Sequence, residues 1–401
     1  MNIWNDNSNR QPIPQDVLDL QQIVREVQQA LAATAVERDR IGGTAKAERD
    51  LLRRSGLLTL AVPKAHGGHG AGWPVVLASV RELAKVDSSL AHLYAFQHLM
   101  VASVIFYGAP VQQRRFLEET VAGTLFWGNA LNPLDQRTSL RPDGDGFRLD
   151  GAKSFCSGAS DSDRLLVSAH DGEGKLRILV VPTRRDGIAI LDDWDNMGQR
   201  QTDSGGVTFS HVRVEADEIL GPPGPFGDVF SGLRPLLAQS ILATIYLGIA
   251  EGAFAQALAF SRGPGRPWIF SGVERAVDDP FLQHHYGELW VALEGVDALA
   301  ARAWARFQEA WEKGRALDAD TRGRTAVAIA AFKAMAARVG LDVTARVFDL
   351  TGAKATAARH GLDRHWRNLR THTLHDPVDY KLKELGAWVL TDLWPQPSFY
   401  S

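Results

Sequence analysis

Hydrophobic and polar positions divide the chain into two helical regions that flank a β region. In the first region, before residue 122, apolar residues recur at steps of three and four and so share one helix face: Val17, Leu20, Val24, Val27 and Leu31. Short β-type runs follow between residues 124 and 221, separated by Asp-Gly turns. Helical spacing then returns, with a long apolar stripe at Leu289, Leu293, Val296, Ala300, Ala303 and Phe307.

This order predicts three domains, at 1–122, 123–224 and 225–401. Strands without helices between them favour an antiparallel barrel or sandwich in the middle domain. A dinucleotide-binding Rossmann sheet is disfavoured, because no strands and helices alternate. The glycine-rich segment at 63–74 is therefore predicted to be a turn between helices.

Composition narrows the class of protein. The 401 residues carry a net charge of −3 and no long basic run, which disfavours nucleic-acid binding. The single cysteine, Cys156, excludes an internal disulfide and a cysteine-rich zinc site. The most apolar stretch, Leu236–Ala250, is shorter than the roughly 20 residues of a membrane span and predicts a buried core helix. We expect a cytoplasmic protein with no signal peptide and no membrane partner.

Histidines supply most of the candidate chemistry. His372 and His375 are three residues apart, so a single helical turn would direct both into one cavity. A metal site, structural histidines and a catalytic pocket all remain open for this pair. On such a helix, Asp376 would point elsewhere. Of His92 and His98, at most one is expected to face a given pocket, because six residues separate them.

Other catalytic patterns are weak or missing. There is no Gly-x-Ser-x-Gly elbow and no phosphate-binding P-loop. Aromatic residues near the β region could line a planar cofactor or pack in the core: Trp127, Phe155, Trp194 and Trp268. The residues alone thus predict a pocket that contains histidines, without a reaction.

Several motifs together resemble a known family. They are PKAHGGHGAG at 63–72, GAKSFCSGA at 151–159, MGQRQTDSGGVTFSHVRV at 197–214, RPW at 266–268 and DRHWRNLRTHTLHDPVDYK at 363–381. In this order they resemble the acyl-CoA dehydrogenase superfamily, and within it the reduced-flavin monooxygenases related to dibenzothiophene monooxygenase. The resemblance implies an α+β fold with an N-terminal helical domain, a middle β-barrel and a C-terminal four-helix bundle that assembles as a homotetramer.

The resemblance also implies a reaction. A separate flavin reductase would supply reduced FMN, and oxygen would add at flavin C4a to give a hydroperoxide. Its outer oxygen would pass to a soft heteroatom, most readily the sulfur of dibenzothiophene or of a smaller sulfide or sulfoxide. Dehydrogenation of an acyl-CoA with FAD, and N-hydroxylation of an amine, remain alternatives.

Catalytic residues are implied by position within the motifs. Asn129 and Ser157 match family positions beside the flavin ring, where they would donate hydrogen bonds. His375 would manage the proton of the peroxide, and His92 would orient substrate or a water molecule.

Further residues are implied to bind the cofactor or the substrate. His372 matches a neighbouring family histidine, Arg266 a residue that would hold the FMN phosphate, and Trp194 is a candidate flavin wall. Phe96 stands where the family's dibenzothiophene enzyme has a tyrosine, so the pocket loses a hydroxyl group. No metal is expected.

The dehydrogenase alternative requires a carboxylate base. The C-terminal segment HTLHDPVDY at 372–380 lacks the glutamate that family dehydrogenases place there. Glu251 is the remaining candidate near the pocket, although a place on the helix surface is an equally good interpretation.

Overall fold

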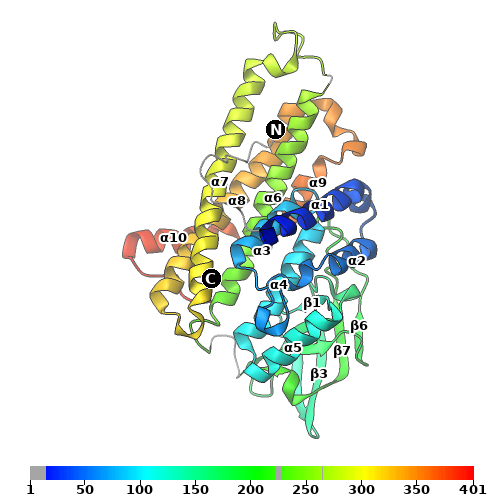
Figure 1. The fold of residues 1–401 in the computed structure, drawn as a ribbon, viewed down its shortest axis with the longest axis vertical. Helices are drawn as coiled ribbons and strands as arrows, with labels where there is room; N and C mark the ends of the chain where they lie inside the picture. Colours follow the sequence, from blue (N-terminus) through cyan, green and yellow to red (C-terminus); the bar gives the residue numbers. More distant parts are fainter. Residues whose placement is uncertain (1–14, 222–226, 264) are drawn as a thin grey trace.

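Five helices open the chain, and a computed structural model describes it over residues 15–221, 227–263 and 265–401. The helices are α1 (Gln15–Ile41), α2 (Lys46–Arg54), α3 (Trp73–Ala84), α4 (Ser88–Tyr107) and α5 (Pro110–Gly123). The glycine-rich segment before α3 is a turn region between helices, as predicted, whereas the Pro-rich break at 222–225 lies outside the described residues. In Figure 1, α1 to α4 lie above the sheet and α5 lies beside it.

The middle region is one eight-stranded sheet. Its strands are β1 (Trp127–Ala130), β2 (Ser139–Asp143), β3 (Gly146–Lys153), β4 (Arg164–His170), β5 (Leu176–Pro182), β6 (Ile188–Ile190), β7 (Val207–Val214) and β8 (Ile219–Leu220). The order is β6-β7-β3-β2-β4-β5-β8, with β1 paired to β4. Most pairs are antiparallel, as predicted, but β4 pairs in parallel with β1 and, at Ser139 and His170, with β2. These strands pair across the intervening hairpins, an arrangement that hydrophobic alternation alone does not reveal.

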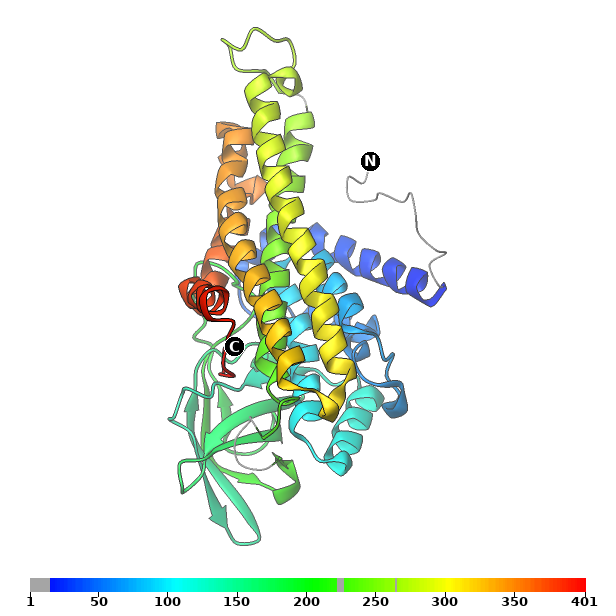
Figure 2. The same cartoon turned by 90° about the vertical axis from the view of Figure 1, so that its left-hand side faces the viewer.

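The C-terminal helices pack as a long bundle beside the other two regions (Figure 2). They are α6 (Leu233–Arg262), α7 (Pro280–Glu312), α8 (Ala319–Thr351), α9 (Asp363–Thr373) and α10 (Val378–Thr391). By length and composition α4 and α6 could each cross a membrane, but their apolar stretches are 94% and 83% buried inside the protein. Helices that are apolar on all sides belong in a core, so the predicted core helix at Leu236–Ala250 is confirmed.

Two hydrophobic cores result. One joins the N-terminal helices to the bundle, and the other fills the interior of the sheet around Leu149, Val167 and Val181. The secondary structure changes from helices to strands between Gly123 and Trp127, and from strands to helices between Leu220 and Leu233. The domain limits 1–122, 123–224 and 225–401 themselves stay a prediction.

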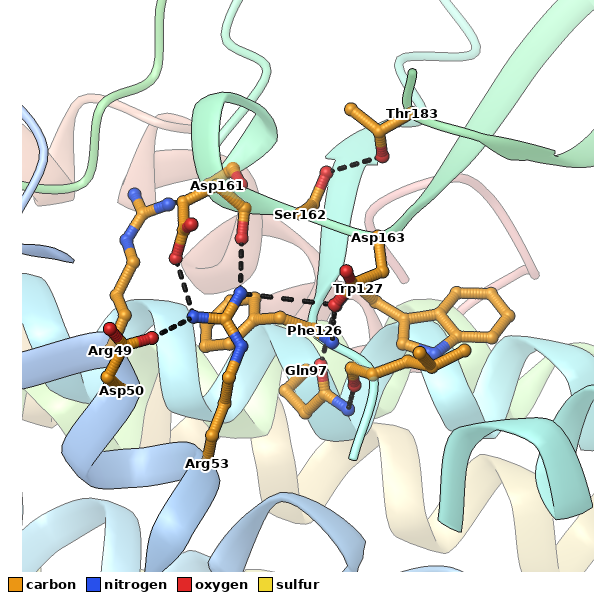
Figure 3. Close-up of polar contacts among 12 residues, drawn as sticks. Arg49, Asp50, Arg53, Gln97, Phe126, Trp127, Asp161, Ser162, Asp163 and Thr183 are labelled. Atoms are coloured by element: carbon orange, nitrogen blue, oxygen red, sulfur yellow. Dashed lines mark hydrogen bonds and ion pairs between the residues drawn. The ribbon is translucent and has the colours of Figure 1, made fainter. Parts of the chain in front are cut away.

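A buried polar junction holds β1 against α4 (Figure 3). The fully buried Gln97 accepts a hydrogen bond from Trp127 N at 2.8 Å and donates to Leu125 O at 3.0 Å. Beside it, Arg53 of α2 donates to the side chain and backbone of Asp161 at 2.7 and 2.6 Å. These contacts set the position of the first strand relative to the helix that carries His92.

Replacing Gln97 by leucine should destabilise this junction. Gln97→Leu leaves a buried N–H and a carbonyl without partners, which should lower the free energy of unfolding by about 2–4 kcal/mol. Urea unfolding of the full chain measures the change. Gln22→Leu, the same substitution on the exposed face of α1, should change it by less than about 0.5 kcal/mol. If the two substitutions had equal effects, the hydrogen bonds of Gln97 would not stabilise the fold as we expect.

Candidate active site

A cavity of about 780 Å³ lies where the sheet meets α4, α6 and the segment after α9. This volume suits a cofactor together with a small substrate. Seven of the eight predicted site residues line it: His92, Phe96, Asn129, Ser157, Trp194, His372 and His375. In particular, Asn129 and His375 border the same hollow. Their individual roles stay predictions.

Arg266 is the predicted residue that the structure does not bring to this cavity. It is exposed in the loop between α6 and α7, which Figure 2 shows at the end of the molecule far from the sheet. Trp268 lies in the same loop and is 68% exposed. Of the other aromatic candidates, Phe155 lines the cavity, while Trp127 is buried in the core of the helices.

Helix α4 presents one face to the cavity. Asp87 caps its N-terminus by accepting from Leu90 N at 3.0 Å. His92 and Phe96, one turn apart, line the cavity and stack on each other with ring centroids 4.0 Å apart. His98 lies on another face, buried against Tyr94. The prediction that only one of the two histidines faces the pocket is confirmed.

A chain of hydrogen bonds crosses the wall of the cavity from α9 to the sheet. His372 Nε2 lies 3.0 Å from His92 Nδ1, and His92 Nε2 lies 3.0 Å from Ser157 Oγ. Ser157 Oγ is 2.7 Å from Ser204 Oγ, which donates to Thr202 Oγ1 at 2.8 Å. All five side chains are buried. The chain therefore joins four segments that are far apart in sequence.

The last acceptor determines which atom donates in each hydrogen bond of this chain. Thr202 donates to the Gln199 carbonyl at 2.9 Å, so Ser204 donates to Thr202. With that proton used, Ser157 must donate to Ser204, and a neutral His92 must donate from Nε2 to Ser157. His92 Nδ1 is then an acceptor, and the proton of His372 lies on Nε2.

The proton order limits what Ser157 has to offer a bound group. Because the Ser157 proton is committed to Ser204, Ser157 can offer the cavity only an oxygen lone pair. In this arrangement Ser157 presents an acceptor and no donor, and its contact with a flavin ring stays a prediction. Asn129 Oδ1 accepts from Leu131 N at 3.2 Å, which leaves the amide hydrogens of Asn129 as donors.

Burial keeps both histidines neutral. Burial, with some repulsion from His375, lowers the pKa of His92 to about 3. Burial also holds the pKa of His372 well below its usual value. Neutral rings are what the proton order above requires.

His372 and His375 both line the cavity, as their spacing predicted. His375 itself lies just beyond α9, which ends at Thr373, and its backbone N donates to the His372 carbonyl at 3.2 Å. Once the chain has left the helix, the side chain of Asp376 turns back and its Oδ1 lies 2.9 Å from His375 Nδ1. The expectation that Asp376 points elsewhere was wrong for this reason. A carboxylate on Nδ1 orients an imidazole and keeps the proton on that nitrogen.

Three buried polar atoms on residues of the wall have no partner: Gln199 Oε1, Thr371 Oγ1 and His372 Nδ1. Buried polar groups are normally bonded, so these atoms fit a ligand that carries donors and acceptors. The backbone of Phe155 and Gln199 is in the left-handed region at φ of 60° and 53°. Such conformations in non-glycine residues concentrate at ligand sites.

Some residues that line the cavity were not predicted from the sequence, and they lie near the ends of elements. Arg234, at the start of α6, and Gln239, one turn later, both line the cavity. The C-terminal tail contributes Tyr400, whose ring lies 5.9 Å from the ring of His375. A lone arginine that precedes a long apolar stretch was the one available signal.

Glu251 does not lie at the cavity. It is buried, paired with Arg81 of α3, and it also lies 3.5 Å from Lys85. Among the described residues, Asp195 is the only carboxylate in the lining, and its side chain is exposed. The cavity therefore lacks the buried base that acyl-CoA dehydrogenation requires.

Fold and cavity together define a helical–β–helical enzyme with a cofactor-sized site between its domains. The chain matches the N-terminal, middle and C-terminal domains of acyl-CoA dehydrogenase over residues 15–124, 128–212 and 240–380. It belongs to the acyl-CoA dehydrogenase family, which confirms the predicted fold class.

Similar proteins place the chain within one branch of that family. It is 52% identical to the probable FMNH2-dependent monooxygenase SfnC of Pseudomonas putida, over 94% of this chain and 96% of that protein. The structure of methanesulfinate monooxygenase MsuC from Pseudomonas fluorescens has a TM-score of 0.93 and 52% identity, and covers 95% of this chain and 99% of that chain.

FMN-bound TdsC from Paenibacillus sp. A11-2, a dibenzothiophene monooxygenase, has a TM-score of 0.91 and 41% identity, and covers 96% of this chain and 100% of that chain. These likenesses confirm the predicted kinship. The chain is a flavin-dependent monooxygenase of this branch.

The neutral histidines predict a steep loss of stability in mild acid. The unfolded chain protonates histidine below about pH 6.5, whereas folded His92 and His98, with pKa values lowered to about 3, do not. Each therefore removes about 1.4 kcal/mol of stability per pH unit as the pH falls below 6.5. Urea unfolding between pH 6.5 and 5 should show this slope. His98→Leu, which leaves the cavity intact, should reduce the slope by the contribution of one histidine, about 1.4 kcal/mol per pH unit. An unchanged slope would contradict the lowered pKa of His98.

Proposed function

We propose that this cavity binds reduced FMN and that the enzyme uses it with O2 to oxygenate the sulfur of a small organosulfur compound. FMN supplies the two electrons and the oxygen-activating ring. Asn129 and Ser157 would hold the ring through one donor and one acceptor, with Trp194 as a side wall. His375 Nε2 is free to accept or return a proton at the reacting end of the site.

Reduced FMN must come from a partner. Within the described residues no two parallel strands are joined by an α-helix, so the chain has no nicotinamide-binding unit of the Rossmann type there. A separate flavin reductase would therefore supply the cofactor, and the cytoplasm is the compartment in which we place both proteins.

Arg234 indicates the class of substrate. It faces the cavity from α6, and its recorded partner is Ser103 Oγ at 3.1 Å, with no carboxylate within 4.0 Å among the described residues. Arg234 is half-buried, and desolvation by burial lowers the pKa of its guanidinium; a partly desolvated cation without a counterion is costly. An anionic substrate would relieve this cost, whereas a cationic amine would be repelled.

An alkanesulfinate combines a negative charge with an oxidisable sulfur, and MsuC is named for such a substrate. The reaction R–SO2⁻ + O2 + FMNH2 → R–SO3⁻ + FMN + H2O balances. One oxygen atom forms a new S–O bond and the other leaves as water. Sulfur and reduced FMN each give up two electrons. We therefore place an alkanesulfinate ahead of a neutral sulfide.

We also propose a homotetramer. Trp268, Ile269 and Phe270 beside Arg266 are 68, 80 and 83% exposed, an apolar group that a second copy could cover. In such an assembly Arg266 could reach the FMN phosphate of a neighbouring subunit, although it does not reach the cavity of its own chain.

The first test is direct. The purified chain, supplied with FMN, NADH and a flavin reductase, should convert methanesulfinate to methanesulfonate with one O2 consumed per product. Ion chromatography measures the product, and reductase alone is the control. If no tested sulfinate, sulfide or sulfoxide is oxidised while FMN is turned over to hydrogen peroxide, the proposed reaction is wrong.

Arg234→Met tests the substrate class. It should raise KM for methanesulfinate about tenfold or more, because a charge-assisted hydrogen bond is lost, and should leave KM for dimethyl sulfide within about twofold. Arg141→Met, an equal loss of charge on an exposed part of β2, is the control. A parallel fall in FMN affinity would assign Arg234 to the cofactor instead.

A further inference from the structure

A buried lysine lies behind the cavity. Lys333 of α8 is 2% exposed, and its Nζ donates to Gln239 Oε1 and to Asp376 Oδ1. An ammonium group inside a helical bundle costs several kcal/mol unless it is fully paired. Both of its partners lead to the cavity: Gln239 lines it, and Asp376 is bonded to His375.

The contact with Asp376 determines which nitrogen of His375 carries a proton. Asp376 Oδ1 receives both Lys333 Nζ and His375 Nδ1, the latter at 2.9 Å. An acceptor that is held as a carboxylate keeps the proton on Nδ1. Nε2 is then the unprotonated nitrogen of a ring that borders the cavity.

The contact with Gln239 fixes the orientation of an amide. Its Oε1 accepts from Lys333, so its two N–H donors are on the other side of the group. Lys333 therefore prepares one acceptor, His375 Nε2, and one donor, the Gln239 amide, on the same wall. The amide can donate to an anionic oxygen atom of a substrate, whereas His375 Nε2 can accept a hydrogen bond from a protonated group.

The charges around Lys333 support this arrangement. Burial would raise the pKa of Asp376, but the His375 hydrogen bond and the charge of Lys333 hold it well below its usual value. Burial lowers the pKa of Lys333 to about 8, against the pull of Asp376. The other titratable groups that face this cluster are Tyr246 of α6, His372 of α9, Lys381 and Glu384 of α10, and Tyr400 of the tail.

We propose that Lys333 is a positioning residue that, through Asp376 and Gln239, holds His375 in the Nδ1-protonated form and directs the Gln239 amide into the cavity. This inference rests on the proposed function, because that function gives His375 its task. Lys333 itself touches neither the cofactor nor the substrate.

Histidine-selective ¹⁵N NMR of the flavin-free protein tests the positioning directly. In the wild type the His375 signal, assigned with His375→Gln, should show a protonated Nδ1 and a bare Nε2. Lys333→Met should convert it to a mixture of the two ring forms or to the Nε2-protonated form, and Lys333→Arg should preserve the wild-type pattern. An unchanged His375 signal in Lys333→Met would overturn the proposal.

Turnover gives a second, independent measure. Lys333→Met should lower the ratio of sulfonate to hydrogen peroxide about tenfold, as loss of a supporting contact does at comparable sites. Asp376→Asn should do the same, and the double variant should be no worse than either single one. Additive losses would contradict a path through Asp376. If Lys333→Met does not fold, Asp376→Asn alone carries the NMR test.

Arg81→Met is the matched control. It removes another partly buried cation that is paired with a carboxylate of α6, Glu251, away from the cavity. It should reduce stability but leave the His375 signal and the product ratio unchanged. If the wild type oxidises no sulfur compound while Lys333→Met still shifts the His375 signal, the proposed function fails and the positioning role remains.

Discussion

A polar group that is withdrawn from water must find a hydrogen-bond partner, and the cavity of this protein depends on that requirement. The chain from His372 through His92 and Ser157 to Ser204 ends on the carbonyl of Gln199. Because each link uses the one proton available to it, the order runs in a single direction. The chain links α4, α9 and two loops next to the sheet, so the packing of these parts and the hydrogen bonding of the wall depend on each other.

The charges of the cavity separate this protein from the dehydrogenases whose fold it shares. Dehydrogenation requires a carboxylate that removes a proton, but here Glu251 is neutralised by Arg81 outside the cavity. In its place the wall contains a cation, Arg234, and neutral imidazoles. Under the proposed function, such a site would favour an anionic substrate. The same architecture thus serves a different reaction through a few charged residues.

Local features of the sequence were good guides to helices and motifs. The spacing of Leu20, Val24, Val27 and Leu31 predicted α1, and the Asp-Gly turns predicted short strands in the middle region. One of these turns joins β2 and β3. The motifs identified seven residues, from distant segments of the chain, that line one cavity. The parallel pairing of β4 with β1 and β2 was not predictable in this way, because alternation shows which face of a strand is buried but not which strand lies beside it.

The sequence by itself determined the elements, the order of domains and the family, since all of these follow from local periodicity and from contiguous motifs. Only the tertiary structure decided how the side chains pair. Asp376 reaches His375 because α9 stops at Thr373, and Lys333 reaches Asp376 because α8 packs beside that point, 43 positions away along the chain. Hydrogen bonds and charges act over a few ångströms in space, whatever the separation in sequence, so their partners become known only when the chain has folded.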